Sequence, residues 1–192
     1  MRTEQAENLN DQMTWRGLVT LTNFHVDCEE AEQIDAYLKT AINIPSEEFQ
    51  KLFHRMKELC TYKEQKFRNL VVSVGRQCFT GRLIGETTYT GIINYGALGT
   101  SSTAVLDAQT TLVAEVKRKA VASRTRTVNS ATVRFFYSKS DTSGTYQEFG
   151  TFIDGTSTIN TGQMFNRVLT GGWAKSASES LTVTVQFDLN NS

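Results

Sequence analysis

The sequence predicts a mainly β protein with an α-helical insertion: an antiparallel, Ig-like β-sandwich plus a two-helix hairpin. The first observation is a series of strand-like segments in residues 117–189, separated by turn-forming residues. The second is strict alternation in the last segment, residues 180–189, which places its apolar residues on one face of a strand. The third is helical spacing of apolar residues over 28–65. Together these patterns indicate strands with a helical insertion.

The domain organisation follows from these changes of pattern. Residues 1–12 are polar and acidic, so we expect an N-terminal arm. Residues 13–27 and 68–192 are expected to form the β-sandwich domain, beginning with a strand over 13–24. Residues 28–67 are expected to form the inserted helical hairpin between the two parts of the sandwich.

Two helices are predicted in the insertion. Asp27 to Glu30 has the form of a capping box, and helical spacing follows it at Ala31, Ile34, Leu38, Ala41 and Ile42. Pro45 breaks this helix, and Ser46 is suited to cap the next one. The second helix has an apolar stripe formed by Phe49, Leu52, Phe53, Met56, Leu59 and Cys60. A short connection between two such helices favours an antiparallel hairpin.

Strand patterns resume after the insertion. We expect a strand at 69–74, a short helix or tight crossover at 75–85, and another strand at 92–98. Residues 107–116 have mixed spacing, from which we predict one or two helical turns. Five strands then follow, over 117–128, 131–138, 145–154, 163–170 and 180–189. The turn residues between them, Gly171 and Gly172 included, are spaced as in antiparallel sandwiches.

Composition restricts the class of partner and the compartment. The 192 residues contain 20 Lys plus Arg and 20 Asp plus Glu, so net charge gives no general attraction to nucleic acid or to an anionic membrane. We therefore expect no nucleic-acid and no membrane partner. Cys28, Cys60 and Cys78 lack metal-ligand spacing, and their odd number disfavours a disulfide framework. Residues 1–11 lack the apolar core of a signal peptide, which predicts a product that is cytosolic when made.

Catalytic chemistry is not expected. His25 and His54 are the two histidines, and their spacing matches no metal-binding or nucleophile motif, so a structural or surface role is favoured. The acidic cluster of Glu29, Glu30, Glu32 and Asp35 is typical of a solvated helix face. We expect no enzyme, no catalytic residues, no metal and no cofactor.

One group of basic residues stands out. It comprises Lys117, Arg118, Lys119, Arg124, Arg126 and Arg134. Aromatic residues for base stacking are missing between residues 117 and 134, which disfavours a nucleic-acid reader. The favoured interpretation is a solvated sheet edge protected from strand addition. The alternative is a docking surface for an acidic partner.

Several segments show a family resemblance. They are residues 15–27, 69–75 with 83–85, the Tyr-Gly-Ala-Leu-Gly-Thr of 95–100, the Glu-x-Gly-x-Phe pattern within 146–152, and the closing strands 164–170 and 181–187. In this order they resemble the small structural proteins of tailed-bacteriophage particles. The resemblance covers most of the chain, but residues 28–65 stand where that family usually has a short loop.

The resemblance implies a structural component of a phage particle, in the tail, the neck or connector, or on the capsid. Such a protein would be made in the host cytoplasm, reside in the virion, and assemble with other virion proteins and with copies of itself, as a homo-oligomer or in many copies. From the sequence, the candidate partner contacts are Phe49, Leu52, Phe53 and Met56, with strand addition at sheet edges as a second route.

A second hypothesis is a module that recognises a host glycan or receptor. Trp173 lies in a Gly-rich segment and Tyr146 is a second candidate, since exposed aromatic rings can stack on sugar rings. The competing interpretation, which we favour, is that Trp173 covers the end of the sandwich core.

Overall fold

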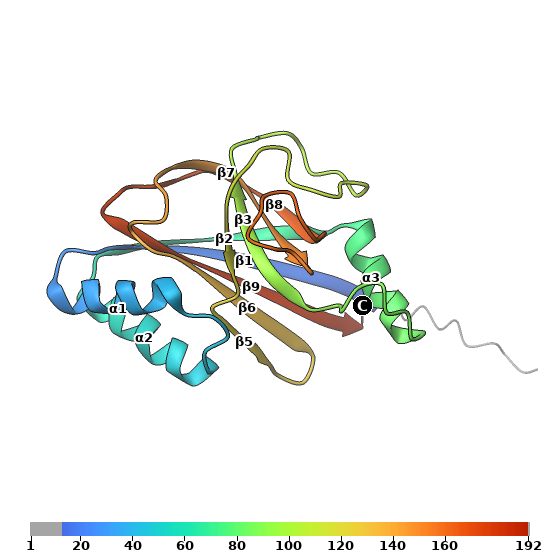
Figure 1. Cartoon of the computed structure of the whole chain (residues 1–192), viewed down its shortest axis with the longest axis horizontal. Coiled ribbons are helices and arrows are strands. Elements are labelled where there is room, and N and C mark those ends of the chain that lie inside the picture. The colour runs from blue at the N-terminus through green and yellow to red at the C-terminus, as the bar shows by residue number, and fades with distance from the viewer. Residues whose placement is uncertain (1–12, 192) are drawn as a thin grey trace, which may run out of the picture.

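The computed structural model describes residues 13–191, and the side chains of residues 17–188. The predicted arm, residues 1–12, lies outside the described residues. In chain order the elements are β1 (Met13–His25), α1 (Glu29–Thr40), α2 (Ser46–Leu59), β2 (Tyr62–Val71), α3 (Ser73–Leu83), β3 (Ile93–Gly99), β4 (Glu115–Ala120), β5 (Ser123–Arg126), β6 (Ser130–Tyr137), β7 (Gly144–Ile153), β8 (Gln163–Lys175) and β9 (Glu179–Asn191). The strands form one nine-stranded sheet with the order β4-β3-β7-β8-β2-β1-β9-β6-β5. The prediction of a mainly β protein is confirmed (Figure 1).

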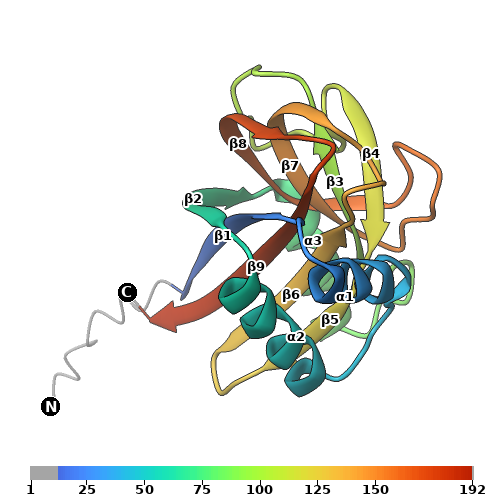
Figure 2. The same ribbon diagram turned by 90° about the vertical axis from the view of Figure 1, so that its left-hand side faces the viewer.

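The sheet curls so that its two halves face each other (Figure 2). β2 is the joint between the halves: residues 62–69 pair with β1, and only Leu70 and Val71 pair with β8. The two halves also meet at the side away from β2. There the buried Tyr137 hydroxyl of β6 donates to the carbonyl of Gly96 of β3 at 2.9 Å. The predicted Ig-like sandwich is not confirmed, because the halves are continuous through β2 and do not form two separate sheets.

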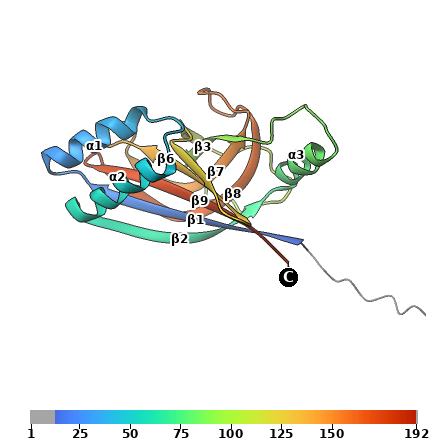
Figure 3. The same ribbon diagram turned by 90° about the horizontal axis from the view of Figure 1, so that it is seen from below.

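The main core fills the space enclosed by the curled sheet. β9 supplies Leu181, Val183, Val185 and Phe187 to it, which confirms the alternation seen in the sequence for these residues. The opposite face of β9 is less solvated than alternation alone suggests. Thr182 is 1% exposed, because α1 and α2 cover this part of the outer face of the sheet (Figure 3).

Helices α1 and α2 lie at the predicted positions, between β1 and β2. A second apolar cluster joins them to the outer face of the sheet through Phe24 and Phe136. The predicted capping box is wrong. The residue before α1 is Cys28, in extended conformation and without a side-chain cap, so Asp27 lies one residue too early for that role. Likewise Ser46 is the first residue of α2 and Pro45 is its N-cap.

Several predicted boundaries are wrong. Residues 62–67, assigned to the insertion, belong to β2. Charged and polar residues occupy both faces there, so only the pairing with β1 reveals a strand. The strand predicted at 69–74 ends at Val71, and the short helix expected after it is α3. Residues 107–116 contain no helix, and β4 begins within them.

The C-terminal strands differ in two places from the prediction. The segment 117–128 is divided between β4 and β5 by Val121 and Ala122. Gly171 and Gly172 do not form a turn but lie inside β8, with φ values of 64° and 86°. Opposite them the register with β7 shifts between Tyr146 and Glu148, so the glycines form a bulge, where positive φ is best tolerated by glycine.

Candidate functional site

The predicted partner contacts face the chain's own sheet. Phe49 and Met56 are fully buried, and Leu52 and Phe53 are half-buried against the same cluster. The ring centroids of Phe53 and Phe24 are 5.3 Å apart in an edge-on arrangement. The apolar stripe of α2 therefore fixes the helix to the sheet, and its side chains do not project toward a partner.

The candidate glycan contacts are also inside the fold. Trp173 is 7% exposed, and its Nε1 donates a hydrogen bond of 2.7 Å to Oδ1 of Asn23. The Lys63 ammonium lies 5.1 Å from the centroid of the indole ring. Tyr146 is buried, with its hydroxyl hydrogen-bonded to that of Thr142. Trp173 thus packs into the core, as the competing interpretation expected, and these positions give the glycan hypothesis no support.

The histidines and cysteines do not form a shared site in the described residues. His54 is on the exposed side of α2, 3.8 Å from the carboxylate of Glu58, and His25 contacts Ser178 through Nδ1 at 3.3 Å. Burial, with the nearby Cys28 and Asp27, raises the pKa of the Cys60 thiol to about 11. Within residues 13–191, no three His, Cys, Asp or Glu side chains are grouped closely enough to hold a metal ion.

The basic group does not form a solvated edge, and that prediction is wrong for most of its members. Arg118 is buried and forms an ion pair of 2.5 Å with Glu115, beneath the loop that follows β7. Arg134 is buried under α2, where it donates to Oγ of Ser46 at 3.3 Å. Lys119 binds the carboxylate of Asp141 at 2.9 Å, and Lys117 lies 3.6 Å from the same carboxylate. Arg124 and Arg126, both on β5, are the exposed members of the group.

β5 is a terminal strand of the sheet, and its outer edge is only partly covered. The linker between α1 and α2 covers the beginning of that edge, near Ser123. Asn43 N–H donates to the carbonyl of Val121 at 3.0 Å, and Ile44 N–H donates to that of Ala122 at 2.9 Å. This contact ends in a parallel bridge between Ile44 and Ser123. In the described part of the chain, no strand pairs with the outer edge of residues 124–126.

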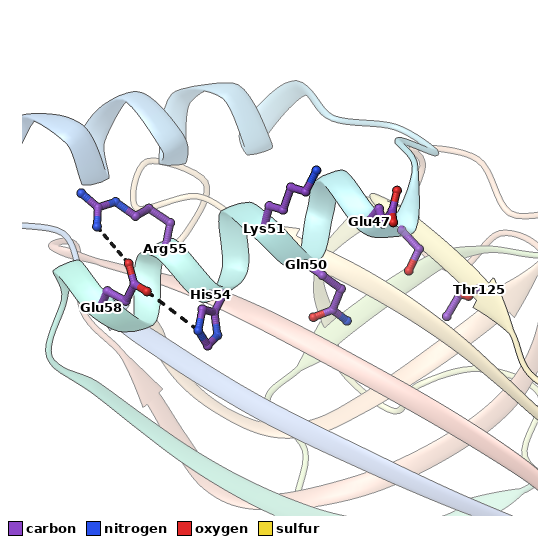
Figure 4. A pocket seen from close by; sticks show the side chains of 8 residues that line it. Glu47, Gln50, Lys51, His54, Arg55, Glu58 and Thr125 are labelled. Carbon is purple, nitrogen blue, oxygen red and sulfur yellow. Dashed lines mark hydrogen bonds and ion pairs between the residues drawn. The ribbon is translucent and has the colours of Figure 1, made fainter.

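A wide, shallow groove of about 730 Å³ lies beside this edge, along the exposed face of α2. The residues that line it are polar or charged, although much of the surface they present is that of their carbon atoms: Ser46, Glu47, Gln50, Lys51, His54, Arg55 and Glu58 from α2, and Thr125 from β5. Figure 4 shows these side chains along the helix, with Thr125 beyond its N-terminal end. Arg55 is held by Glu58 and by Glu30 of α1, at 2.9 and 2.7 Å. We call this surface, together with the open edge of β5, the α2–β5 surface.

Part of this surface was evident before the structure. The basic group included Arg124 and Arg126, and the exposed side of α2 followed from its apolar stripe. That the two lie together was not foreseeable, because the contact between α2 and β5 joins segments about seventy residues apart in the chain.

Comparisons with protein families, with curated proteins and with solved structures found no match for this chain. No helix in the described residues is long and apolar enough to cross a membrane.

Proposed function

We propose that this protein is a structural component of a tailed-bacteriophage particle and that it acts by protein–protein assembly through the α2–β5 surface. The observation that carries the proposal is the position of the open β5 edge beside the polar groove on α2. An exposed strand edge offers backbone hydrogen bonds to another chain, and the adjacent helix offers side chains that select the partner.

The helices can serve as a firm support for such contacts. Glu30 near the start of α1 binds Arg55 near the end of α2, and Tyr37 near the end of α1 binds Glu48 near the start of α2. These pairs, with the apolar cluster beneath them, favour an antiparallel hairpin fixed to the sheet. A surface with this support loses little conformational entropy when a partner binds.

The class of partner comes from the sequence resemblance to phage structural proteins. On this proposal the protein is made in the host cytoplasm and resides in the virion, and its partners are other virion proteins and copies of itself. Many copies on a symmetric particle allow weak individual contacts to act together. No catalytic step is needed for this role.

The test is co-sedimentation of the purified chain with emptied particles from its source, together with its mass by light scattering alone. Lys51→Glu reverses a charge in the groove without touching the buried side of α2. Lys66→Glu, on an exposed position of β2, is the matched control. We expect the control to sediment with particles and the groove variant to remain in the supernatant. A native chain that neither self-associates nor sediments with particles contradicts the proposal.

A further inference from the structure

We propose that the open edge of β5 binds an acidic, extended segment of a partner protein as an added strand. This inference rests on the proposed assembly function and names the chemistry of the partner at the same surface. Three features of the molecule support it. They are the outward backbone groups of β5, the linker segment that pairs with the backbone at the start of this edge, and the positive charge of Arg124 and Arg126.

The backbone register shows which groups are turned outward. Thr127 N–H donates to the carbonyl of Ser130 at 2.9 Å, and Thr125 lies opposite Thr132 on the same ladder. Hydrogen-bonding direction alternates along a strand, so residues 125 and 127 point their backbone groups toward β6. The N–H and C=O groups of Arg126, and the C=O of Arg124, therefore point to the open side.

The backbone just before β5, at Val121 and Ala122, already pairs with a segment of the chain. The linker segment at Asn43 and Ile44 runs parallel to the sheet edge and ends its pairing at Ser123, where Pro45 leads into α2. A segment from another protein would continue the line of this linker along residues 124–126. The opposite terminal strand, β4, offers less positive charge to an acidic segment, because Lys117 and Lys119 already pair with Asp141 in the turn after β6.

The charges of the edge select an acidic segment. Arg124 lies opposite Val133 and Arg126 opposite Ala131, so both side chains are on the same face of the sheet, and both are exposed. In an added strand, residues i and i+2 would lie beside them on that face, where opposite charges directly across strands are stabilising. The intervening residue would lie on the other face, beside Thr125 and the carboxylate of Glu47 in the groove. The structure thus favours the pattern Glu-x-Glu, with a small uncharged residue between the acids.

The experiment measures binding of the full chain to the dye-labelled peptide Thr-Glu-Thr-Glu-Thr, blocked at both ends, by fluorescence anisotropy. Its comparison peptide is Thr-Lys-Thr-Lys-Thr. Arg126→Glu tests the charge, and we expect it to weaken binding by about tenfold or more, since an attraction is replaced by a repulsion. Arg126→Pro compared with Arg126→Gln tests the backbone, because both variants remove the charge and only proline removes an outward N–H that β6 does not use. Arg68→Glu, at an exposed position of β2, is the matched control and should bind as the native chain does.

Amide hydrogen exchange supplies the second measurement. On binding the acidic peptide, the Arg126 amide should gain protection, while the Thr127 amide, already bonded to β6, should change little. If Arg126→Pro does not fold, this comparison on the native chain still decides the mode of binding.

Three results would overturn the proposal. They are no binding of the acidic peptide, equal binding of the Lys peptide, or loss with Arg126→Glu while Arg126→Pro binds no more weakly than Arg126→Gln and the Arg126 amide gains no protection. The last result means an ionic contact without strand addition. A chain that fails these tests but still sediments with particles leaves the assembly function standing and refutes only the acidic strand. A chain that passes them but does not sediment with particles supports the strand site and refutes the proposed role in the virion.

Discussion

Glu148 and Arg167 form an ion pair that is entirely buried, with Nε and Oε2 separated by 2.7 Å and both side chains 0% exposed. The pair lies where β7 and β8 meet the segment of residues 100–114. Glu148 also accepts from the backbone N–H groups of Val113 and Ala114, and Arg167 donates to the carbonyls of Thr103 and Ala104. These contacts explain why a stretch without helix or strand over most of its length has a defined course.

Arg167→Met should lower the free energy of unfolding by about 3–5 kcal/mol, because it leaves a buried carboxylate without its charged partner. Urea denaturation measures this change. Hydrogen exchange should show the loss of protection concentrated in residues 100–114. Arg68→Met, at an exposed arginine, should change stability by no more than about 0.5 kcal/mol. Similar small effects of both variants would contradict the role given to the pair.

Phe49→Ala should lower the free energy of unfolding by about 3–5 kcal/mol, since the side chain is fully buried between α2 and the sheet. Lys51→Ala, two residues away on the groove side of α2, should be nearly neutral for stability. Thermal and urea unfolding provide the comparison. A stable Phe49→Ala variant that has lost particle binding would restore the sequence-based view of Phe49 as a partner contact.

Asp141 makes stability depend on pH. Burial alone raises the pKa of its carboxyl, but the hydrogen bonds from Lys119 and from the Ser138 N–H, with the charge of Lys117, outweigh burial, and the net pKa is lowered from 3.8. A lowered folded-state pKa means that the stabilisation is complete above the unfolded value and is lost as pH falls through the folded value.

Asp141→Asn should therefore be about 1 kcal/mol less stable than the native chain at pH 7, and this difference should shrink as pH falls below 3.8. Urea unfolding at a series of pH values measures it. Asp27→Asn, at an exposed carboxylate before α1, serves as the control. A deficit that persists unchanged in acid would mean that packing, rather than charge, holds Asp141.

Gly171→Ala should lower the free energy of unfolding by about 1–2 kcal/mol, because the backbone conformation at this position disfavours a residue with a Cβ. Gly171 has a φ of 64°, and a Cβ placed there meets no atom within 4 Å, so steric overlap with neighbours adds nothing. Gly171→Asn should cost less, because asparagine tolerates this region better. Equal losses for both variants in urea unfolding would contradict a cost that is set by the backbone conformation of Gly171.

Much of the local structure was evident in the sequence. The alternation of Leu181, Val183, Val185 and Phe187 specified β9 and its buried face, since successive side chains of a strand point to opposite faces. Helical spacing likewise located α1 and α2, whose bounds depend on local propensity and on Pro45. These features are set by residues that are neighbours in the chain.

What the sequence alone did not determine was what each face would contact. β2 has too little apolar pattern to be recognised before β1 is beside it, and the curl of the sheet depends on β2 changing partners at Leu70. Arg118 and Arg134 look like solvated charges until Glu115 and α2 cover them, while Arg124 and Arg126 stay exposed. The amino-acid sequence determined the periodicity of each helix and strand, because periodicity depends on residues that are neighbours in the chain. Tertiary structure decided burial, ion pairing and the open β5 edge, because these depend on contacts between segments that are distant in sequence.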